Sequence, residues 1–314
     1  MNEIFNLDEA NKKLRDICKD RINSKYSEEE YQKVEKQLDD ELKIIEDQKS
    51  AMDYLLVLDV LENVGAQNDE YVFMGAITST LVSYLIDISD IDPFDESIPA
   101  VYSEFCYGLD GGHKTSFELR VNLDLYDRLV NYFETIQNSN GKDYFIKRYD
   151  DHGKLIGAYI EINLDNGIFS NNSFLFMPIT EPTEIISDEI IRICKPKSFE
   201  EYVKCYGLTH GTGTWEDNGK YLINSNGKKL YDLIAYREDV YEFLLNSGIE
   251  ITRAYDLAEY VRKGKAERRG FSEEVKTELI SKGIPTWFIE SCCKIRYLFP
   301  RSHGMTFVKR FVKI

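Results

Sequence analysis

The chain has 314 residues, of which 43% are hydrophobic, and its formal net charge is −16. This length can support a substantial core, and we expect two compact units. No apolar run approaches the ~20 residues that a membrane helix requires. The N-terminus has no basic segment followed by an apolar stretch, so no secretory signal is predicted. Six dispersed cysteines without a Cys-x-x-Cys pair argue against zinc and predict a reducing, cytoplasmic location.

The charge is unevenly distributed along the chain. Residues 253–314 carry 14 Lys and Arg against 7 Asp and Glu, a net charge of +7, whereas residues 1–252 carry −23. Because binding to polyphosphates depends on Lys and Arg, the C-terminal region is the part suited to nucleic acid. The alternative is that the asymmetry only reflects a composition rich in Lys, Asn, Ile and Glu.

The first predicted elements are helices. Ser27 and Glu30 have the spacing of a capping box, which closes exposed N–H groups at a helix start. Apolar residues then recur every three or four positions over residues 31–45, which predicts one buried helical stripe. A second helix is predicted near residues 51–63, with Gly65 placed to end it.

Strands follow the first helices. The apolar stretch that begins at Tyr71 predicts a buried strand, a turn and a buried helix that is closed by Asp92-Pro93. Residues 144–149 and 156–162 flank a loop that contains Gly153, which predicts a β-hairpin. Residues 169–177 offer a further strand.

The helical pattern returns after residue 195. Ser198 and Glu201 form another capping-box pattern. We therefore divide the chain into residues 1–137, a β-rich connecting segment over 138–190, and a helical region over 191–314.

Several motifs in the helical region occur together in one known family. They are Pro196–Thr212 (PKSFEEYVKCYGLTHGT), a VRKGK sequence at 261–265, and Trp287–His303 (WFIESCCKIRYLFPRSH). In this order and spacing they resemble the fingers of the PolC-type bacterial DNA polymerase III alpha subunit. The resemblance spans roughly residues 8–125 and 191–314. It implies an α+β chain in which a mixed-sheet palm remnant with helices is followed by a mostly helical fingers-like domain.

The resemblance also implies where catalytic residues should lie. Nucleotidyl transfer uses two divalent metals about 4 Å apart, which are bridged by carboxylates. The family supplies an Asp-x-Asp pair on one strand, whose side chains share a face, and a third Asp on a neighbouring strand. Here the pair falls on or near Arg120-Val-Asn122, and Asn163 is nearest to the third position. We therefore predict a degenerate palm without catalytic residues, bound metal or cofactor, in which Arg120 pairs with a nearby acid.

The family's phosphate-binding turn is eroded in the same region. It should fall on residues 72–76, where Val72 replaces a glycine and Met74 replaces the phosphate-pairing arginine. Gly75, Ser79 and Thr80 are the remnants that could still donate to a phosphate. The family's OB, exonuclease and PHP domains have no counterpart in these 314 residues, so the resemblance is to a truncated form.

Ten residues of the helical region are candidates for binding DNA or a nucleotide. The VRKGK loop could contact phosphates, or its cations could complement a helix C-terminus. A histidine could line a nucleotide pocket or fix a turn, and Trp215 and Trp287 could stack on bases or fill the core. Cys292-Cys293 is interpreted as packing. The candidates are His210, Thr212, Arg237, Arg262, Lys263, Lys265, Lys294, Arg296, Arg301 and His303.

The preferred hypothesis is a catalytically inactive PolC-type protein whose fingers-like region binds DNA, a nucleotide or a replisome protein, with no membrane partner. One alternative is an interaction or scaffold protein without nucleic-acid binding, which the acidic body favours. A further alternative is a residual DNA-directed DNA polymerase that holds Mg²⁺ with Asp124, Asp127 and Asp165 as substitute ligands.

Overall fold

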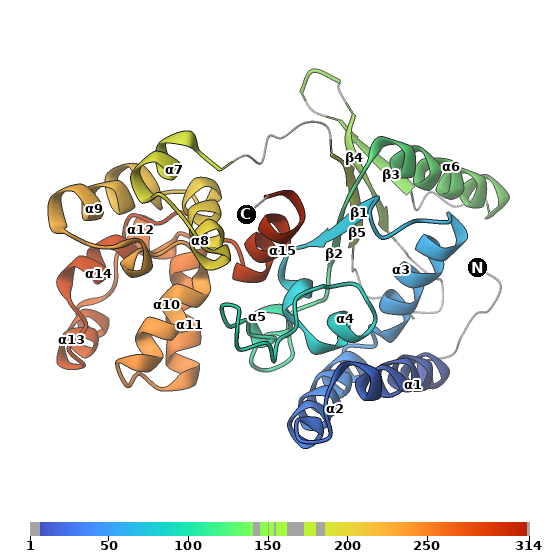
Figure 1. Cartoon of the computed structure of the whole chain (residues 1–314), viewed down its shortest axis with the longest axis horizontal. Helices are drawn as coiled ribbons and strands as arrows, with labels where there is room; N and C mark the ends of the chain where they lie inside the picture. The colour runs from blue at the N-terminus through green and yellow to red at the C-terminus, as the bar shows by residue number, and fades with distance from the viewer. Residues whose placement is uncertain are drawn as a thin grey trace. The chain divides into compact units, whose positions relative to one another are not determined.

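The computed structural model describes residues 7–140, 145–149, 151–153, 155–161, 173–179 and 186–312. The chain divides into two compact units (Figure 1). Unit 1 comprises residues 1–95 and 102–183, and unit 2 comprises residues 96–101 and 184–314. Unit 1 holds a mixed β-sheet with helices, and the described part of unit 2 is mostly helical. The α+β class predicted from the sequence is confirmed.

Unit 1 combines six α-helices and a short 3₁₀ helix with five strands in its described part. The helices are α1 (Leu7–Lys25), α2 (Tyr31–Asp47), α3 (Ala51–Asn63), η1 (Ala76–Ser79), α4 (Leu81–Leu85), α5 (Glu104–Tyr107) and α6 (Leu123–Asn140). The strands are β1 (Tyr71–Met74), β2 (Phe117–Val121), β3 (Phe145–Tyr149), β4 (Leu155–Glu161) and β5 (Ser173–Pro178).

The local sequence signals explain several of these boundaries. Helix α3 spans the predicted residues, and the chain leaves it at Gly65, whose φ of +64° is a conformation that glycine adopts without strain. The predicted capping role of Ser27 is wrong, because α2 begins after Glu30 without a side-chain cap; the Glu30 carboxylate instead accepts hydrogen bonds from the Ser27 N–H and hydroxyl, at 3.0 and 2.7 Å, in the turn before the helix. The predicted strand at Tyr71 is confirmed as β1.

The five strands form one sheet in the order β1-β2-β5-β4-β3. β2 and β5 are parallel, whereas the other neighbouring pairs are antiparallel. The predicted hairpin is confirmed by the pairing of β3 with β4. Residues 150 and 154 of its loop lie outside the described residues, as do residues 169–172 of the third predicted strand.

Helices α3 and α6 of unit 1 pack on one face of the sheet. Tyr54 of α3 packs edge-on against Phe117 of β2, with ring centroids 5.0 Å apart. Tyr126 and Phe133 of α6 pack against Phe176 of β5. Burial alternates along β2, so residues 117, 119 and 121 face this core while residues 118 and 120 lie on the opposite face.

Unit 2 is built from helices joined by short connections. Its elements are α7 (Asp188–Cys194), α8 (Phe199–His210), the π-helix η2 (Trp215–Lys220), α9 (Tyr221–Asn226), the 3₁₀ helix η3 (Leu230–Asp232), α10 (Arg237–Asn246), α11 (Ile251–Arg262), α12 (Lys265–Arg269), α13 (Glu273–Ser281), α14 (Thr286–Cys292) and α15 (Arg301–Phe311). The predicted cap of α8 is present, since the Ser198 hydroxyl accepts from the Glu201 N–H at 3.3 Å.

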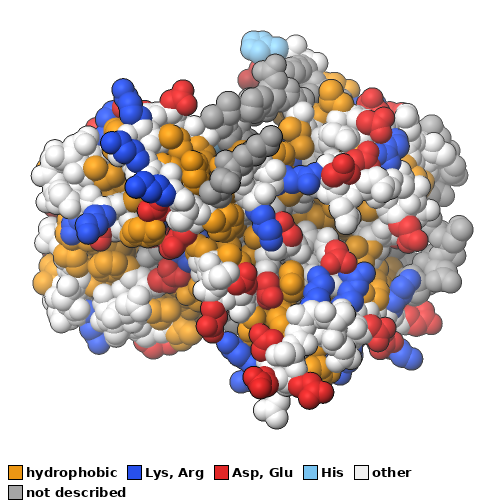
Figure 2. All heavy atoms as spheres, viewed as in Figure 1, with side chains coloured by type: hydrophobic (Ala, Val, Ile, Leu, Met, Phe, Trp, Pro, Cys, Tyr) orange, Lys and Arg blue, Asp and Glu red, His pale blue; other side chains and the backbone are white. Residues whose placement is uncertain are grey.

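Over the described ranges, no helix has the length and apolar content to cross a membrane. Basic side chains are interspersed with acidic ones on the face shown in Figure 2.

Candidate functional site

The face of β2 opposite the core carries the position that the resemblance assigns to metal ligands. Glu118 and Arg120 are two residues apart on this strand, so their side chains lie on the same face. The Arg120 Nη2 lies 3.1 Å and its Nε lies 3.2 Å from Glu118 Oε1. The predicted pairing of Arg120 with a nearby acid is confirmed. Glu118 was not predicted as this partner, although residues at i and i+2 of a strand share a face.

Asn122 follows β2 and serves the start of α6. Its side-chain oxygen accepts from the Leu125 N–H at 2.8 Å, and its own N–H donates to the Glu70 carbonyl oxygen at 2.8 Å. The neutral oxygen of Asn122 is therefore used as a helix cap.

The proposed substitute ligands lie on α6 as far as the structure describes them. The Asp124 carboxylate pairs with Arg128 at 3.1 Å, and Asp127 is exposed on the same helix. Asn163 and Asp165 lie outside the described residues. Within the described part of the chain, no three His, Cys, Asp or Glu side chains come together in an arrangement that could hold a metal. The described residues near β2 therefore do not fit a two-metal site.

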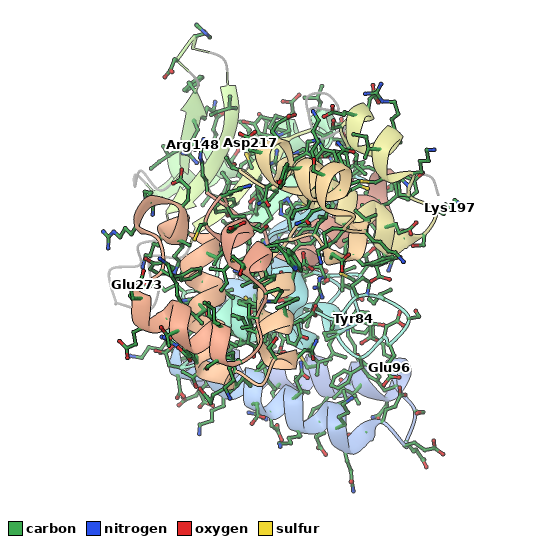
Figure 3. The ribbon with its side chains drawn as sticks, turned by 90° about the vertical axis from the view of Figure 1, so that its left-hand side faces the viewer. Tyr84, Glu96, Arg148, Lys197, Asp217 and Glu273 are labelled. Atoms are coloured by element: carbon green, nitrogen blue, oxygen red, sulfur yellow. The ribbon has the colours of Figure 1, made fainter. Side chains whose placement is uncertain are left out.

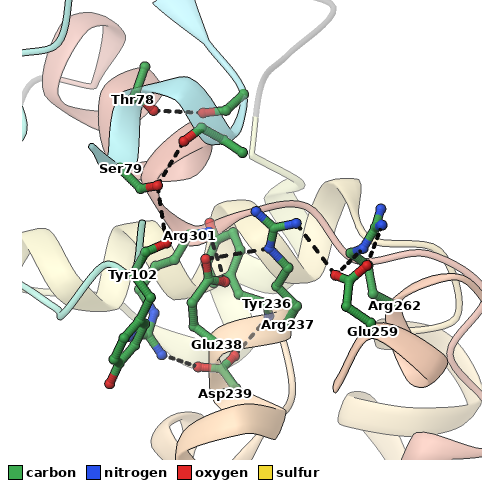
Figure 4. Close-up of polar contacts among 12 residues, drawn as sticks. Thr78, Ser79, Tyr102, Tyr236, Arg237, Glu238, Asp239, Glu259, Arg262 and Arg301 are labelled. Carbon is green, nitrogen blue, oxygen red and sulfur yellow. Dashed lines mark hydrogen bonds and ion pairs between the residues drawn. The ribbon is translucent and has the colours of Figure 1, made fainter. Parts of the chain in front are cut away.

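The remnant of the phosphate-binding turn is occupied by internal hydrogen bonds. Gly75 precedes η1 with a φ of +89°. The Ser79 hydroxyl donates to the Ala76 and Tyr102 carbonyl oxygens, at 2.7 and 3.2 Å, the latter drawn in Figure 4. The Thr80 hydroxyl caps α4 by accepting from the Ser83 N–H at 3.2 Å. Ser79 and Thr80 are both buried.

A carboxylate occupies the helix start next to this turn. The two oxygens of Glu41, from α2, accept from the Leu81 and Val82 N–H groups at 3.1 and 2.9 Å. Burial raises the pKa of Glu41 to about 7, against the lowering effect of these hydrogen bonds. The buried position of Glu41 was not predicted. A charged residue next to the apolar residues 38, 42 and 45 of the buried stripe was the signal for it in the sequence.

Unit 2 contains a cleft of about 870 Å³ that brings together four of the predicted binding residues, His210, Thr212, Lys294 and Arg296. The connection after α8 reaches it, since the Arg296 N–H donates to the Thr212 carbonyl oxygen at 2.8 Å. Gly213, with a φ of +80°, has no room for a side chain, because an added Cβ would lie 2.1 Å from the Lys294 carbonyl oxygen.

A ring contact holds His210 in the cleft, and a hydrogen bond holds Trp215. The His210 ring lies 4.4 Å from the Tyr206 ring, measured between centroids. Trp215 is 7% exposed, and its indole N–H donates to Glu189 at 2.9 Å. This supports the interpretation of Trp215 as a core residue, with one edge toward the cleft.

Carboxylates outnumber cations among the residues that line the cleft. Lys220 lies beside it and pairs with two of these acids, which include Glu189 at 2.8 Å. The Lys294 ammonium donates to the Asp217 carbonyl oxygen at 2.6 Å, and Arg296 pairs with Glu267 at 3.2 Å. Asp217 is labelled in Figure 3. The lining acids are Glu189, Glu216, Asp217 and Glu267.

The VRKGK loop is held by one acid. Arg262 makes a bidentate pair with Glu259, with both N–O distances at 2.7 Å, and Lys263 pairs with the same carboxylate at 2.9 Å; Figure 4 shows the Arg262–Glu259 pair. These cations lower the pKa of Glu259 to about 2 in spite of its burial. Lys265 is exposed at the start of α12, and Gly264 packs against the Arg296 carbonyl oxygen.

The remaining candidates are buried inside unit 2. Arg301 pairs with both oxygens of Glu242 at 2.6 Å and with Asp239 at 2.9 Å. These carboxylates raise the pKa of Arg301 against the effect of its burial. Arg237 is 4% exposed and lies near Glu238 and Glu259 (Figure 4).

His303 is also buried. It is 6% exposed, and the centroid of its ring lies 4.9 Å from that of Phe299. This position at the start of α15 supports its interpretation as a residue that fixes a turn.

Comparison with known proteins supports the family resemblance in the N-terminal region of the chain. Residues 12–144 match the family described as the bacterial DNA polymerase III alpha NTPase domain. The chain is 40% identical over 132 residues to the PolC-type DNA polymerase III of Thermotoga petrophila, which is 42% of this chain and 9% of that protein. The corresponding enzymes of Listeria innocua and Bacillus subtilis are 39% and 36% identical over 126 residues, which is 40% of this chain and 8% of each relative.

The chain matches less than a tenth of the length of these relatives. The predicted resemblance to the PolC-type alpha subunit is confirmed over residues 12–144.

Proposed function

We propose that this chain is a PolC-type alpha-like protein, a catalytically inactive relative of the polymerases, and acts in the cytoplasm by binding. The observation that carries the proposal is the ion pair between Arg120 and Glu118 on the face of β2. Two Mg²⁺ ions need several carboxylates that face a common point. A guanidinium at this point repels a divalent cation and engages the neighbouring carboxylate.

The phosphate-binding turn supports the same proposal. In a helix start that binds phosphate, backbone N–H groups point at the anion. Here the Leu81 and Val82 N–H groups already donate to Glu41, whose carboxylate is fully buried. A nucleotide phosphate would have to displace this carboxylate, so the turn is poorly suited to bind a triphosphate.

A primer-extension assay tests the inactivity. Purified protein is incubated with a labelled primer-template, all four nucleotides and either Mg²⁺ or Mn²⁺, and we expect no extension. Template-dependent extension that is lost in Asp124→Asn and Asp127→Asn would contradict the proposal and would support the residual polymerase instead.

For the binding role, we favour a nucleotide or a DNA phosphate at the cleft of unit 2. Lys294, Arg296 and Lys265 are exposed, and the first two line the cleft with His210 and Thr212. Phosphate binding depends on cations of this kind. The buried candidates Arg237, Arg301 and His303 would then contribute by holding the shape of unit 2.

A protein partner is the second candidate, because four of the residues that line the cleft are acidic and two are cationic. A basic segment of a replisome protein would complement this lining, whereas DNA would be repelled by its carboxylates. In this alternative the protein is a scaffold without nucleic-acid binding.

Titration of a labelled primer-template across salt, with and without nucleotide, separates the two candidates. We expect binding that weakens with salt and that is lost in a variant with Lys294→Ala and Arg296→Ala. The matched control replaces Lys276, a partly exposed lysine of α13, and Lys282, the exposed lysine at its C-cap, which do not line the cleft. Equal losses in both variants would contradict binding at the cleft. No binding at low salt, with a protein recovered by pull-down after nuclease treatment, would favour the scaffold.

A further inference from the structure

Helices α7 and α8 form a hairpin that places two cysteines side by side. Helix α7 ends at Cys194, and Lys195 then adopts a left-handed conformation, with a φ of +49°, that turns the chain. The connecting loop carries Lys197, which is labelled in Figure 3. At the other end of the hairpin, the Ser187 N–H donates to the Thr209 hydroxyl at 3.1 Å. The two helices are therefore tied together at the end opposite the loop.

The two thiols of this hairpin contact each other directly. Cys194 is half-buried, whereas Cys205, in the middle of α8, is fully buried. Their side chains are joined by a hydrogen bond, which lowers the pKa of Cys194 and raises the pKa of Cys205. Cys194 is therefore the thiol of the pair that solvent and a small disulfide can reach, and a thiolate is the reactive form of cysteine.

We propose that Cys194 and Cys205 form a reversible disulfide when the protein meets a small disulfide such as oxidised glutathione. The Cys194 thiolate attacks one sulfur of glutathione disulfide, whose S–S bond breaks and releases one glutathione. Cys205 then gives its proton to water, and its sulfur attacks the Cys194 sulfur and releases the second glutathione. Two protein thiols are oxidised and one glutathione disulfide is reduced to two thiols, so atoms and electrons balance.

The other cysteines of the chain are less suited to this reaction. Cys18 and Cys106 are both buried, which leaves their thiols shielded from a small disulfide. Cys292 is also buried and directly precedes the half-buried Cys293. A disulfide needs Cα atoms about 4.4–6.8 Å apart, whereas consecutive Cα atoms are about 3.8 Å apart. Cys293 therefore provides a matched control, because it is a half-buried thiol outside the proposed pair.

The disulfide would act on one wall of the cleft. Ser187, Glu189 and Ile190 of the α7 segment and Leu208, Thr209 and His210 of α8 all line it. A covalent link between the helices would fix these two groups of residues relative to each other. This inference concerns thiol chemistry and does not depend on what the cleft binds.

The test treats the whole protein with oxidised glutathione, blocks the remaining thiols with iodoacetamide and maps the peptides by mass spectrometry. We expect a linked pair of peptides that contain Cys194 and Cys205, with the loss of two hydrogens, and its reversal by dithiothreitol. Cys194→Ser and Cys205→Ala should each abolish the link, and Cys293→Ser should retain it. Cys194→Ser keeps the test valid if replacement of the buried Cys205 impairs folding.

Three outcomes would overturn the proposal. They are alkylation of both thiols after treatment, a glutathione adduct at Cys194 that does not resolve, and a disulfide that involves any other cysteine.

Discussion

Glu41 offers the clearest test of the energetics of unit 1, through its replacement by glutamine. The carboxyl is buried, and its pKa is raised to about 7 from an ordinary value of 4.5. Between these values the folded state keeps a proton that the unfolded state has lost. The stability of unit 1 is therefore highest below the unfolded pKa and falls as pH rises to about 7. A difference of roughly 2.5 pKa units corresponds to about 3 kcal/mol, since each unit is worth about 1.4 kcal/mol.

Glu41→Gln removes this titration and leaves an amide of the same shape. We expect the stability of the variant to change less between pH 4.5 and pH 8. The free energy of unfolding of the wild type, relative to that of the variant, should therefore fall by about 3 kcal/mol as pH rises over this range. The amide supplies one acceptor for two backbone N–H groups, so the variant should also be less stable than the wild type at low pH.

Urea unfolding followed by circular dichroism measures this difference. Both tryptophans, Trp215 and Trp287, lie in unit 2, so the fluorescence transition reports unit 2 and should be the same in the two proteins. Glu46→Gln, on the exposed side of α2, is the matched control and should retain the pH dependence of the wild type. An equal pH dependence in the wild type and Glu41→Gln would refute the reasoning.

Two further predictions concern unit 2. Gly304→Ala should destabilise it by about 1–3 kcal/mol or more, as overpacking does, because the new Cβ would lie 2.0 Å from the Tyr236 hydroxyl. Tyr236→Phe should recover part of this loss in the double variant, and purely additive effects in urea unfolding would contradict the clash. Glu259→Gln should cost about 3–5 kcal/mol by leaving Arg262 and Arg237 without their shared carboxylate. Since the pKa of Glu259 is lowered to about 2, its contribution in the wild type is present above pH 4.5 and lost as pH falls toward 2, which tryptophan fluorescence can follow.

The fold could be predicted where its signals are local. Helix α3 was predicted near its observed residues because an apolar segment is followed by a glycine that can end a helix. The strands β1, β3 and β4 were found in the same way. Their order in the sheet was not predicted, because the parallel pairing of β2 with β5 joins segments more than 50 residues apart.

The candidate site was predictable only in part, because several of its contacts join residues that are far apart in the sequence. The family resemblance placed Arg120 at the expected metal-ligand position, and strand alternation puts its side chain on the face of β2 opposite the core. The contact between Glu41 and the Leu81 N–H group spans 40 residues, and no local pattern specifies it. The position of Arg301 shows the same limit, because its pairing with Glu242, 59 residues away, decides whether this cation is exposed or buried.

The internal pairing changes what the basic C-terminal region can do. The net charge of +7 over residues 253–314 suggests an extended contact with phosphates. However, Arg262 and Lys263 pair with Glu259, and Arg301 is buried with its own carboxylates. The exposed candidate cations outside the Glu259 cluster are Lys265, Lys294 and Arg296, of which the last two line the cleft, and Arg296 also pairs with Glu267.

Three phosphate contacts would give a slope of log affinity against log salt of about −2.7, since each neutralised phosphate of a duplex contributes about −0.9. Opening the ion pairs of Glu259 would add Arg262 and Lys263, for about five contacts and a slope of about −4.5. A slope that falls from about −4.5 to about −2.7 in a variant with Arg262→Ala and Lys263→Ala would mean that these pairs open when DNA binds, whereas an unchanged slope would mean that they persist in the complex.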